Sequence, residues 1–206
     1  MATQTTGLTP AEEARWTSLV SKGIDMSVVG LSGMVGKEVR ITKPVVPHKI
    51  QIKDAPELLG GAEAQAVAVY LQIRGAAPGH MVLVYTPETA IDLVDLLLDQ
   101  PMGTTKELGE MELSALGEMG NIMGSFFLNT LADTTGLDLQ PTPPAVLMDM
   151  AGSVLDMALA EIMLEVDELL IVDTVFGTED HQIHGTFLVL PSPALVRHLL
   201  HGENAA

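Results

Sequence analysis

Hydrophobic positions along the chain follow two different periods. Residues 66–73 (AVAVYLQI) show a two-residue alternation, whereas residues 81–85 (MVLVY) and 186–190 (TFLVL) are nearly continuous apolar runs. Such patterns predict strands with one or both faces buried. Apolar residues at helical spacing predict helices at 88–100 and 194–201, and longer helices at about 9–35 and 106–133.

The same succession of predicted elements occurs twice. Pro87 and Pro193 each end an apolar strand and precede a periodic helix, where proline is favoured. Gly75 and Gly177 each close a predicted strand before a hairpin loop. The repeat predicts an α/β (α+β) sandwich, in which two pseudo-symmetric halves of the α-β-β-β-α type surround a shared sheet. The halves cover about 9–100 and 106–201 of one domain over residues 1–206.

Composition narrows the partners and the compartment. The chain has 206 residues, 47% of them hydrophobic, with no cysteine and a formal net charge of −17. Nucleic acid is not an expected partner, because binding to phosphates depends on Lys and Arg. The N-terminus has no basic and apolar leader, and no run of 18 apolar residues occurs. We therefore expect a cytoplasmic protein without membrane insertion.

The predicted helix around residues 113–133 carries a polar stripe. Ser114, Glu118 and Asn121 are four and three residues apart, which places them on one helix face, and Ser125 and Asn129 extend it. Glycines at 120 and 124 cost the helix roughly 1 kcal/mol each relative to alanine. Their missing side chains are expected to let the backbone of a partner come close.

This stripe resembles a known family signature. Residues 114–121 read SALGEMGN, and 22 residues separate Asn121 from Pro144. The order of Ser, Glu, Asn and Pro at this spacing is similar to that of the CheC, CheX and FliY phosphatases of chemotaxis, and CheC-type proteins also consist of two pseudo-symmetric halves. The resemblance therefore covers essentially the whole chain and is closest to a CheC-like protein.

The resemblance implies hydrolysis of the aspartyl phosphate on the response regulator CheY. Such phosphoryl transfer depends on a positioned water and on charge stabilisation. By resemblance, Asn121 orients the attacking water and Glu118 engages a lysine of the regulator. Mg²⁺ is expected on the phosphorylated partner, so this chain needs no cofactor or metal site of its own. Four further residues are expected to contact the partner: Ser114, Gly120, Gly124 and Ser125.

Two alternatives stay open at this point. The first concerns single residues of the signature: Ser114 can instead bond a backbone carbonyl of its own helix, and Pro144 can be a structural turn residue beside Pro141 and Pro143. The second alternative concerns the whole protein. A non-enzymatic chemotaxis adaptor that binds CheY or the deamidase CheD would have the same fold.

The first half has a degenerate version of the signature. When the halves are aligned on their polar positions, Ser18 matches Ser114, Lys22 matches Glu118 and Asp25 matches Asn121. A lysine would repel the lysine of a regulator, and an aspartate would repel its phosphoryl group. The sequence therefore predicts one active site, with Lys22 and Asp25 marking a degenerate second one.

Overall fold

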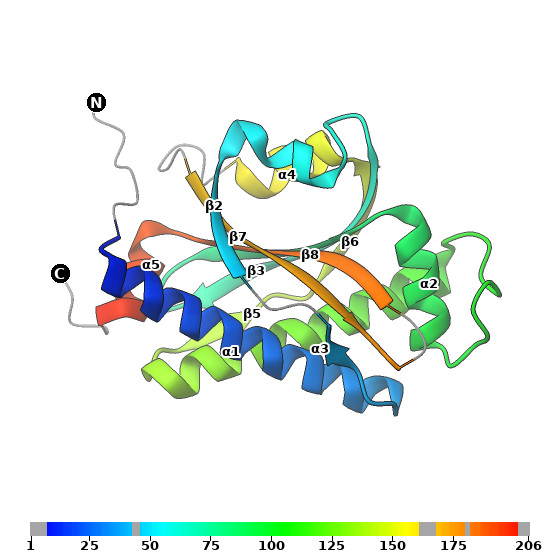
Figure 1. Cartoon of the computed structure of the whole chain (residues 1–206), viewed down its shortest axis with the longest axis horizontal. Coiled ribbons are helices and arrows are strands. Elements are labelled where there is room, and N and C mark those ends of the chain that lie inside the picture. Colours follow the sequence, from blue (N-terminus) through cyan, green and yellow to red (C-terminus); the bar gives the residue numbers. More distant parts are fainter. Residues whose placement is uncertain (1–7, 43–45, 161–167, 180–181, 202–206) are drawn as a thin grey trace.

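The computed structural model describes residues 8–42, 46–160, 168–179 and 182–201. Within these residues the chain forms an eight-stranded sheet whose strands pair in antiparallel fashion. Helices cover both faces of the sheet (Figure 1). The predicted fold class is therefore confirmed. None of the described helices is long and apolar enough to cross a membrane.

The two halves contain the same succession of helices and strands, except that a 3-10 helix in the first half takes the place of an α-helix in the second. The first half consists of α1 (Pro10–Val35), β1 (Arg40–Ile41), β2 (Val46–Gln51), the 3-10 helix η1 (Ile52–Leu59), β3 (Gln65–Gly75), β4 (Gly79–Tyr85) and α2 (Pro87–Leu97). The second consists of α3 (Glu110–Thr135), β5 (Leu139–Pro141), β6 (Ala145–Met150), α4 (Ala151–Leu159), β7 (Glu168–Gly177), β8 (Gln182–Pro191) and α5 (Pro193–His201). Each half thus has one more short strand than the sequence predicted.

The two halves exchange their short strands. The strand order is β1-β7-β8-β4-β3-β5, so the long strands β4 and β8 pair at the centre. On one side β1 and β2 of the first half pair with β7 of the second. On the other side β5 and β6 of the second half pair with β3 of the first. Each edge of the sheet therefore combines strands from both halves.

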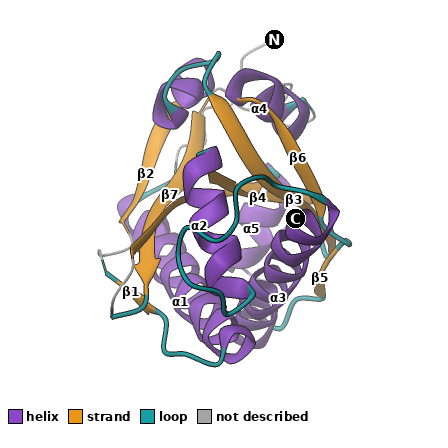
Figure 2. Ribbon diagram, turned by 90° about the vertical axis from the view of Figure 1, so that its right-hand side faces the viewer, coloured by secondary structure: helices purple, strands orange, loops and turns teal. Residues whose placement is uncertain are grey.

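Successive side chains along a strand point to opposite faces of the sheet, so the strands contribute to two separate cores. The larger core lies between the sheet and the helices α1, α2, α3 and α5, and its strand residues include Val67, Val69, Leu71, Met81, Leu83, Phe187 and Val189. The smaller core lies under η1 and α4, and its strand residues are Ala66, Ala68, Val82, Val84, Leu188 and Leu190. Figure 2 shows the sheet between these helical layers. All of β4 is buried, as its apolar run predicts.

The long helices α1 and α3 begin and end in the same way. Each has 26 residues. Glu12 and Glu112, in the first turns, accept the N–H of the residue before the helix at 2.7 and 3.0 Å. Both helices stop at a left-handed glycine, Gly36 with φ 65° and Gly136 with φ 77°. Equivalent positions therefore differ by 100 in residue number (12 and 112, 36 and 136).

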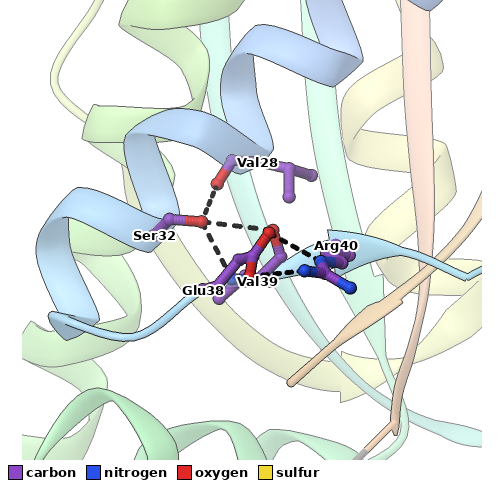
Figure 3. Close-up of polar contacts among 5 residues, drawn as sticks. All are labelled: Val28, Ser32, Glu38, Val39 and Arg40. Carbon is purple, nitrogen blue, oxygen red and sulfur yellow. Dashed lines mark hydrogen bonds and ion pairs between the residues drawn. The ribbon is translucent and has the colours of Figure 1, made fainter. Parts of the chain in front are cut away.

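A serine in the last turn of α1 connects this helix to the residue before β1. The Ser32 hydroxyl accepts the N–H of Val39 at 2.9 Å and lies 3.0 and 3.2 Å from the carbonyl oxygens of Val28 and Val39 (Figure 3). Beside it the Arg40 guanidinium makes two bonds of 2.6 Å to Glu38, which hold the pKa of that carboxyl below its usual value. The Ser32 bonds therefore tie the residue before β1 to the last turn of α1.

The connection between the halves is held by a buried carboxylate on α2. Asp95 accepts the backbone N–H groups of Thr104 at 3.0 Å and Thr105 at 2.9 Å. Burial raises the pKa of Asp95, but hydrogen bonds from the side chain of Thr105 and from the backbone lower it further than burial raises it. The ionised carboxylate therefore anchors the segment that leads into α3.

Candidate functional site

A groove runs between α3 and the edge of the sheet formed by β5 and β6. Its volume is about 560 Å³. One wall is the α3 face with Leu113, Ser114, Gly117, Glu118 and Asn121, and the other is made by Pro141, Pro143, Pro144 and Val146. The groove thus unites the Ser, Glu, Asn and Pro positions of the predicted signature.

Two glycines set the distance between α3 and the sheet. A Cβ atom at Gly120 would lie 2.3 Å from Val69 Cγ1, and one at Gly124 would lie 3.1 Å from Leu71 Cδ2. Both glycines are buried. The expectation that they admit the backbone of a partner is therefore corrected, because their missing side chains admit strand β3 instead.

The polar stripe faces away from this contact. Ser114 and Glu118 are exposed, and Asn121 is half-buried. In the part of the chain that the structure describes, these three side chains make no hydrogen bond or ion pair. They are therefore available to a molecule that enters the groove.

Ser114 differs from the threonines of α3. Thr130, Thr134 and Thr135 each donate to the carbonyl four residues earlier at 2.7 Å. Ser114 makes no such bond among the described residues, although its position in the helix allows one. Ser125, also expected to contact a partner, is half-buried one turn beyond Asn121 and does not line the groove.

The sheet wall of the groove is aliphatic. Pro141 ends β5, Pro143 and Pro144 connect it to β6, and Val146 on β6 lies opposite Val69 of β3. The wall comes closest to the helix at Gly117, where a Cβ would lie 3.5 Å from Val146 Cγ2 and 4.0 Å from Pro144 Cγ. Pro144 therefore lines the groove as well as shaping a connection.

Sequence reasoning gave no site role to Gly117, Pro141, Pro143 or Val146. The proline cluster was visible in the sequence, but its position beside α3 depends on the pairing of β5 and β6 with β3. That pairing joins residues more than 60 positions apart in the chain, such as Ile73 and Pro141. Local patterning carries no signal for contacts of this kind.

The first half has different residues at the equivalent positions. With helices aligned by their ends, Glu118 corresponds to Ser18 and Asn121 to Ser21, one helical turn away from the predicted match at Lys22 and Asp25. Lys22 instead donates to the Thr134 hydroxyl of α3 at 3.2 Å. The helix ends therefore place Ser18 and Ser21, rather than the predicted Lys22 and Asp25, at the positions equivalent to Glu118 and Asn121.

Electrostatically the groove carries one charge. Among the described residues that line it, Glu118 is the only ionisable one, so these residues offer a single carboxylate beside an amide and a hydroxyl. This arrangement suits a cationic group of a partner better than a metal ion, which needs several ligands from one site. Among the described residues no three His, Asp or Glu side chains gather into a metal site.

Comparison with known proteins identifies relatives that share this segment. The model of the CheC-like family matches residues 111–148, which include every residue that lines the groove. The CheY-P phosphatase CheC of Bacillus subtilis (strain 168) is 28% identical over 162 residues, which is 78% of this chain and 77% of that protein.

Solved structures share the fold. FliY from Thermotoga maritima has a TM-score of 0.76 at 21% identity, covering 94% of this chain and 96% of that one. A chain of the CheX–CheY–BeF3–Mg²⁺ complex from Borrelia burgdorferi has a TM-score of 0.55 at 18% identity, covering 85% and 99%. Together with the sequence matches, these structures confirm the resemblance to the CheC, CheX and FliY family.

Proposed function

Because this chain is CheC-like in sequence and in fold, we propose that it is a cytoplasmic phosphatase that hydrolyses the aspartyl phosphate of the chemotaxis response regulator CheY. The B. subtilis relative carries this activity in its name, and a related fold occurs in a complex that contains CheY. The observation that carries the proposal is the groove itself. It joins Glu118, Asn121 and Pro144, and its polar side chains have no partner among the described residues.

Asn121 is proposed to orient the attacking water. Its carboxamide both accepts and donates hydrogen bonds, so it can hold a water in line with the phosphorus atom. The water attacks phosphorus, the aspartate carboxylate of the regulator leaves, and inorganic phosphate is released. Being half-buried, Asn121 has restricted side-chain freedom, which lowers the entropy cost of holding that geometry.

Glu118 is proposed to hold the regulator rather than to act as a base. It is exposed at the groove, where it can pair with a lysine of the regulator. Mg²⁺ is proposed to be held by acidic residues of the phosphorylated regulator, where it neutralises charge on the phosphoryl group. The residues of this chain then supply positioning, and Ser114 adds a hydrogen-bonding group to the lining of the groove.

The test is phosphate release from phosphorylated CheY of the same organism, with Mg²⁺ present, with and without this chain. A phosphatase accelerates release at concentrations of the chain far below that of CheY. Saturable binding to CheY or CheD with an unchanged rate of release would instead identify the adaptor. Neither binding nor faster release would reject both functions.

A further inference from the structure

Helix α3 contains three interior glycines, and packing explains only two of them. Gly120 and Gly124 admit the sheet, since a Cβ there would lie within 2.3 and 3.1 Å of strand side chains. Gly117 is different. Its added Cβ would lie 3.5 Å from Val146 and 4.0 Å from Pro144, which are ordinary contact distances.

Alanine at position 117 should therefore fit the folded chain and stabilise it. Gly in a helix interior costs roughly 1 kcal/mol relative to alanine. The φ angle of Gly117 is also not positive, so the backbone does not require glycine. Local packing and backbone geometry thus give no reason for a glycine at this position.

The place that a side chain would fill is the middle of the groove. Gly117 is three residues after Ser114 and four before Asn121, so all three lie on one face of the helix. A side chain at 117 would project between this polar stripe and the aliphatic wall of Pro144 and Val146. It would occupy volume that the groove now leaves open.

A comparison with the first half supports a functional reason for the missing side chain at position 117. The position equivalent to Gly117 is Thr17, which is half-buried. At this half the Glu and Asn positions are also replaced, by Ser18 and Ser21. The open position and the polar pair therefore occur together in α3 and are both missing from α1.

We propose that Gly117 is a positioning residue, whose missing side chain admits an apolar side chain of the phosphorylated regulator between Asn121 and the Pro144–Val146 wall. The chemistry of the occupant follows from the wall, which is aliphatic on the side that Gly117 faces. Seating this side chain fixes the depth at which Asn121 meets the phosphoryl group. The inference rests on the proposed phosphatase function.

The test compares Gly117→Ala and Gly117→Thr, the residue of the first half, with Gly33→Ala. Gly33 is an exposed glycine of α1 where an added Cβ meets nothing within 4 Å, so its alanine variant controls for helix stabilisation alone. With phosphorylated CheY as substrate, KM should rise about tenfold for Gly117→Ala and further for Gly117→Thr, because one added methyl group in a closed site costs this much. At saturation kcat should fall as well, because a regulator that is seated less deeply holds its phosphoryl group farther from Asn121.

Thermal unfolding separates this role from a structural one. Gly117→Ala and Gly33→Ala should both unfold at or above the wild-type temperature, while only the former raises KM. An unchanged KM in an active protein would overturn the role of Gly117 and leave the phosphatase function standing. If the chain binds CheY without turnover, the Kd of the same variants decides in the same way. Absence of both binding and turnover would overturn the proposed function and this inference together.

Discussion

The two long helices have the same ends and nearly the same buried positions, yet they use small residues for different contacts. In α1 the small residues face α3: a Cβ at Gly23 would lie 2.6 Å from Phe127, and the Ser27 hydroxyl donates to the carbonyl of Met123 at 2.8 Å. In α3 the small residues Gly120 and Gly124 face the sheet. At the equivalent positions α1 has the larger residues Val20 and Ile24.

This difference explains how a duplicated fold can have one candidate site. Close packing of α3 on β3 brings its polar face beside the β5–β6 edge, and Gly117 leaves the space between them open. In α1 the corresponding polar pair is reduced to two serines, and Lys22 is engaged with α3. The candidate site therefore lies in the second half, while α1 of the first half packs against α3, which carries it.

The largest expected effect comes from Asn121→Ala, which removes the residue that distinguishes α3 from α1 most directly. Loss of the water-positioning amide should lower kcat for CheY-phosphate hydrolysis by on the order of 10²-fold. Stability should not fall, since alanine is the better helix former. The matched control is Asn129→Ala, at an exposed position two turns along the same helix and outside the groove. Wild-type kcat in Asn121→Ala would remove Asn121 from the mechanism.

The second prediction concerns the packing of α3. Gly120→Ala should lower the free energy of unfolding by about 2–3 kcal/mol, because its Cβ would overlap Val69 in a closely packed core. Gly117→Ala, one turn earlier, should instead raise it by up to about 1 kcal/mol. Urea unfolding of both variants measures the two signs. Equal stability of the two variants would return Gly120 to the partner-binding role that the sequence suggested.

The two glycine roles show why the sequence predicted the fold better than the site. Alternating and continuous apolar runs identified β3, β4 and β8, and the helix predicted from residue 88 begins one residue earlier, at Pro87. A glycine on a helix, however, has the same sequence pattern whether it admits a strand or a partner. The difference follows from the strand register that pairs Val146 with Val69, because Gly120 faces Val69 of β3 and Gly117 faces Val146 of β6.

The predicted match between positions of α1 and α3 was shifted by one helical turn, for a related physical reason. A shift of four residues nearly preserves the exposed and buried faces of a helix with 3.6 residues per turn, so Lys22 and Asp25 fitted the polar stripe almost as well as Ser18 and Ser21. The ends of the helices resolve the shift. Their signals were present in the sequence, as the glutamates at 12 and 112 and the glycines at 36 and 136.

A smaller effect is expected for Glu118→Gln, which keeps the shape of the side chain and removes its charge. Loss of one exposed ion pair should weaken binding of phosphorylated CheY by up to about fivefold, with little change in kcat. The difference from wild type should shrink as salt is added, because salt screens exposed charges. Glu110→Gln is the control, as an exposed acidic residue on α3 outside the groove. Equal weakening by both variants would show that overall charge, rather than Glu118, attracts the regulator.

The smallest effects are expected in the first half. Alanine at Ser18 and Ser21 together should leave turnover of CheY phosphate within about twofold of wild type, because neither hydroxyl can replace the carboxylate and amide of the α3 site. Alanine at Lys22 and Asp25 should do the same, since both are exposed and substitutions at such sites usually change stability by no more than about 0.5 kcal/mol. Each pair is measured beside the Glu118→Ala and Asn121→Ala double variant. If either first-half pair reduced turnover as severely as that variant while remaining folded, α1 would carry a second site and the asymmetry between the helices would have no functional meaning.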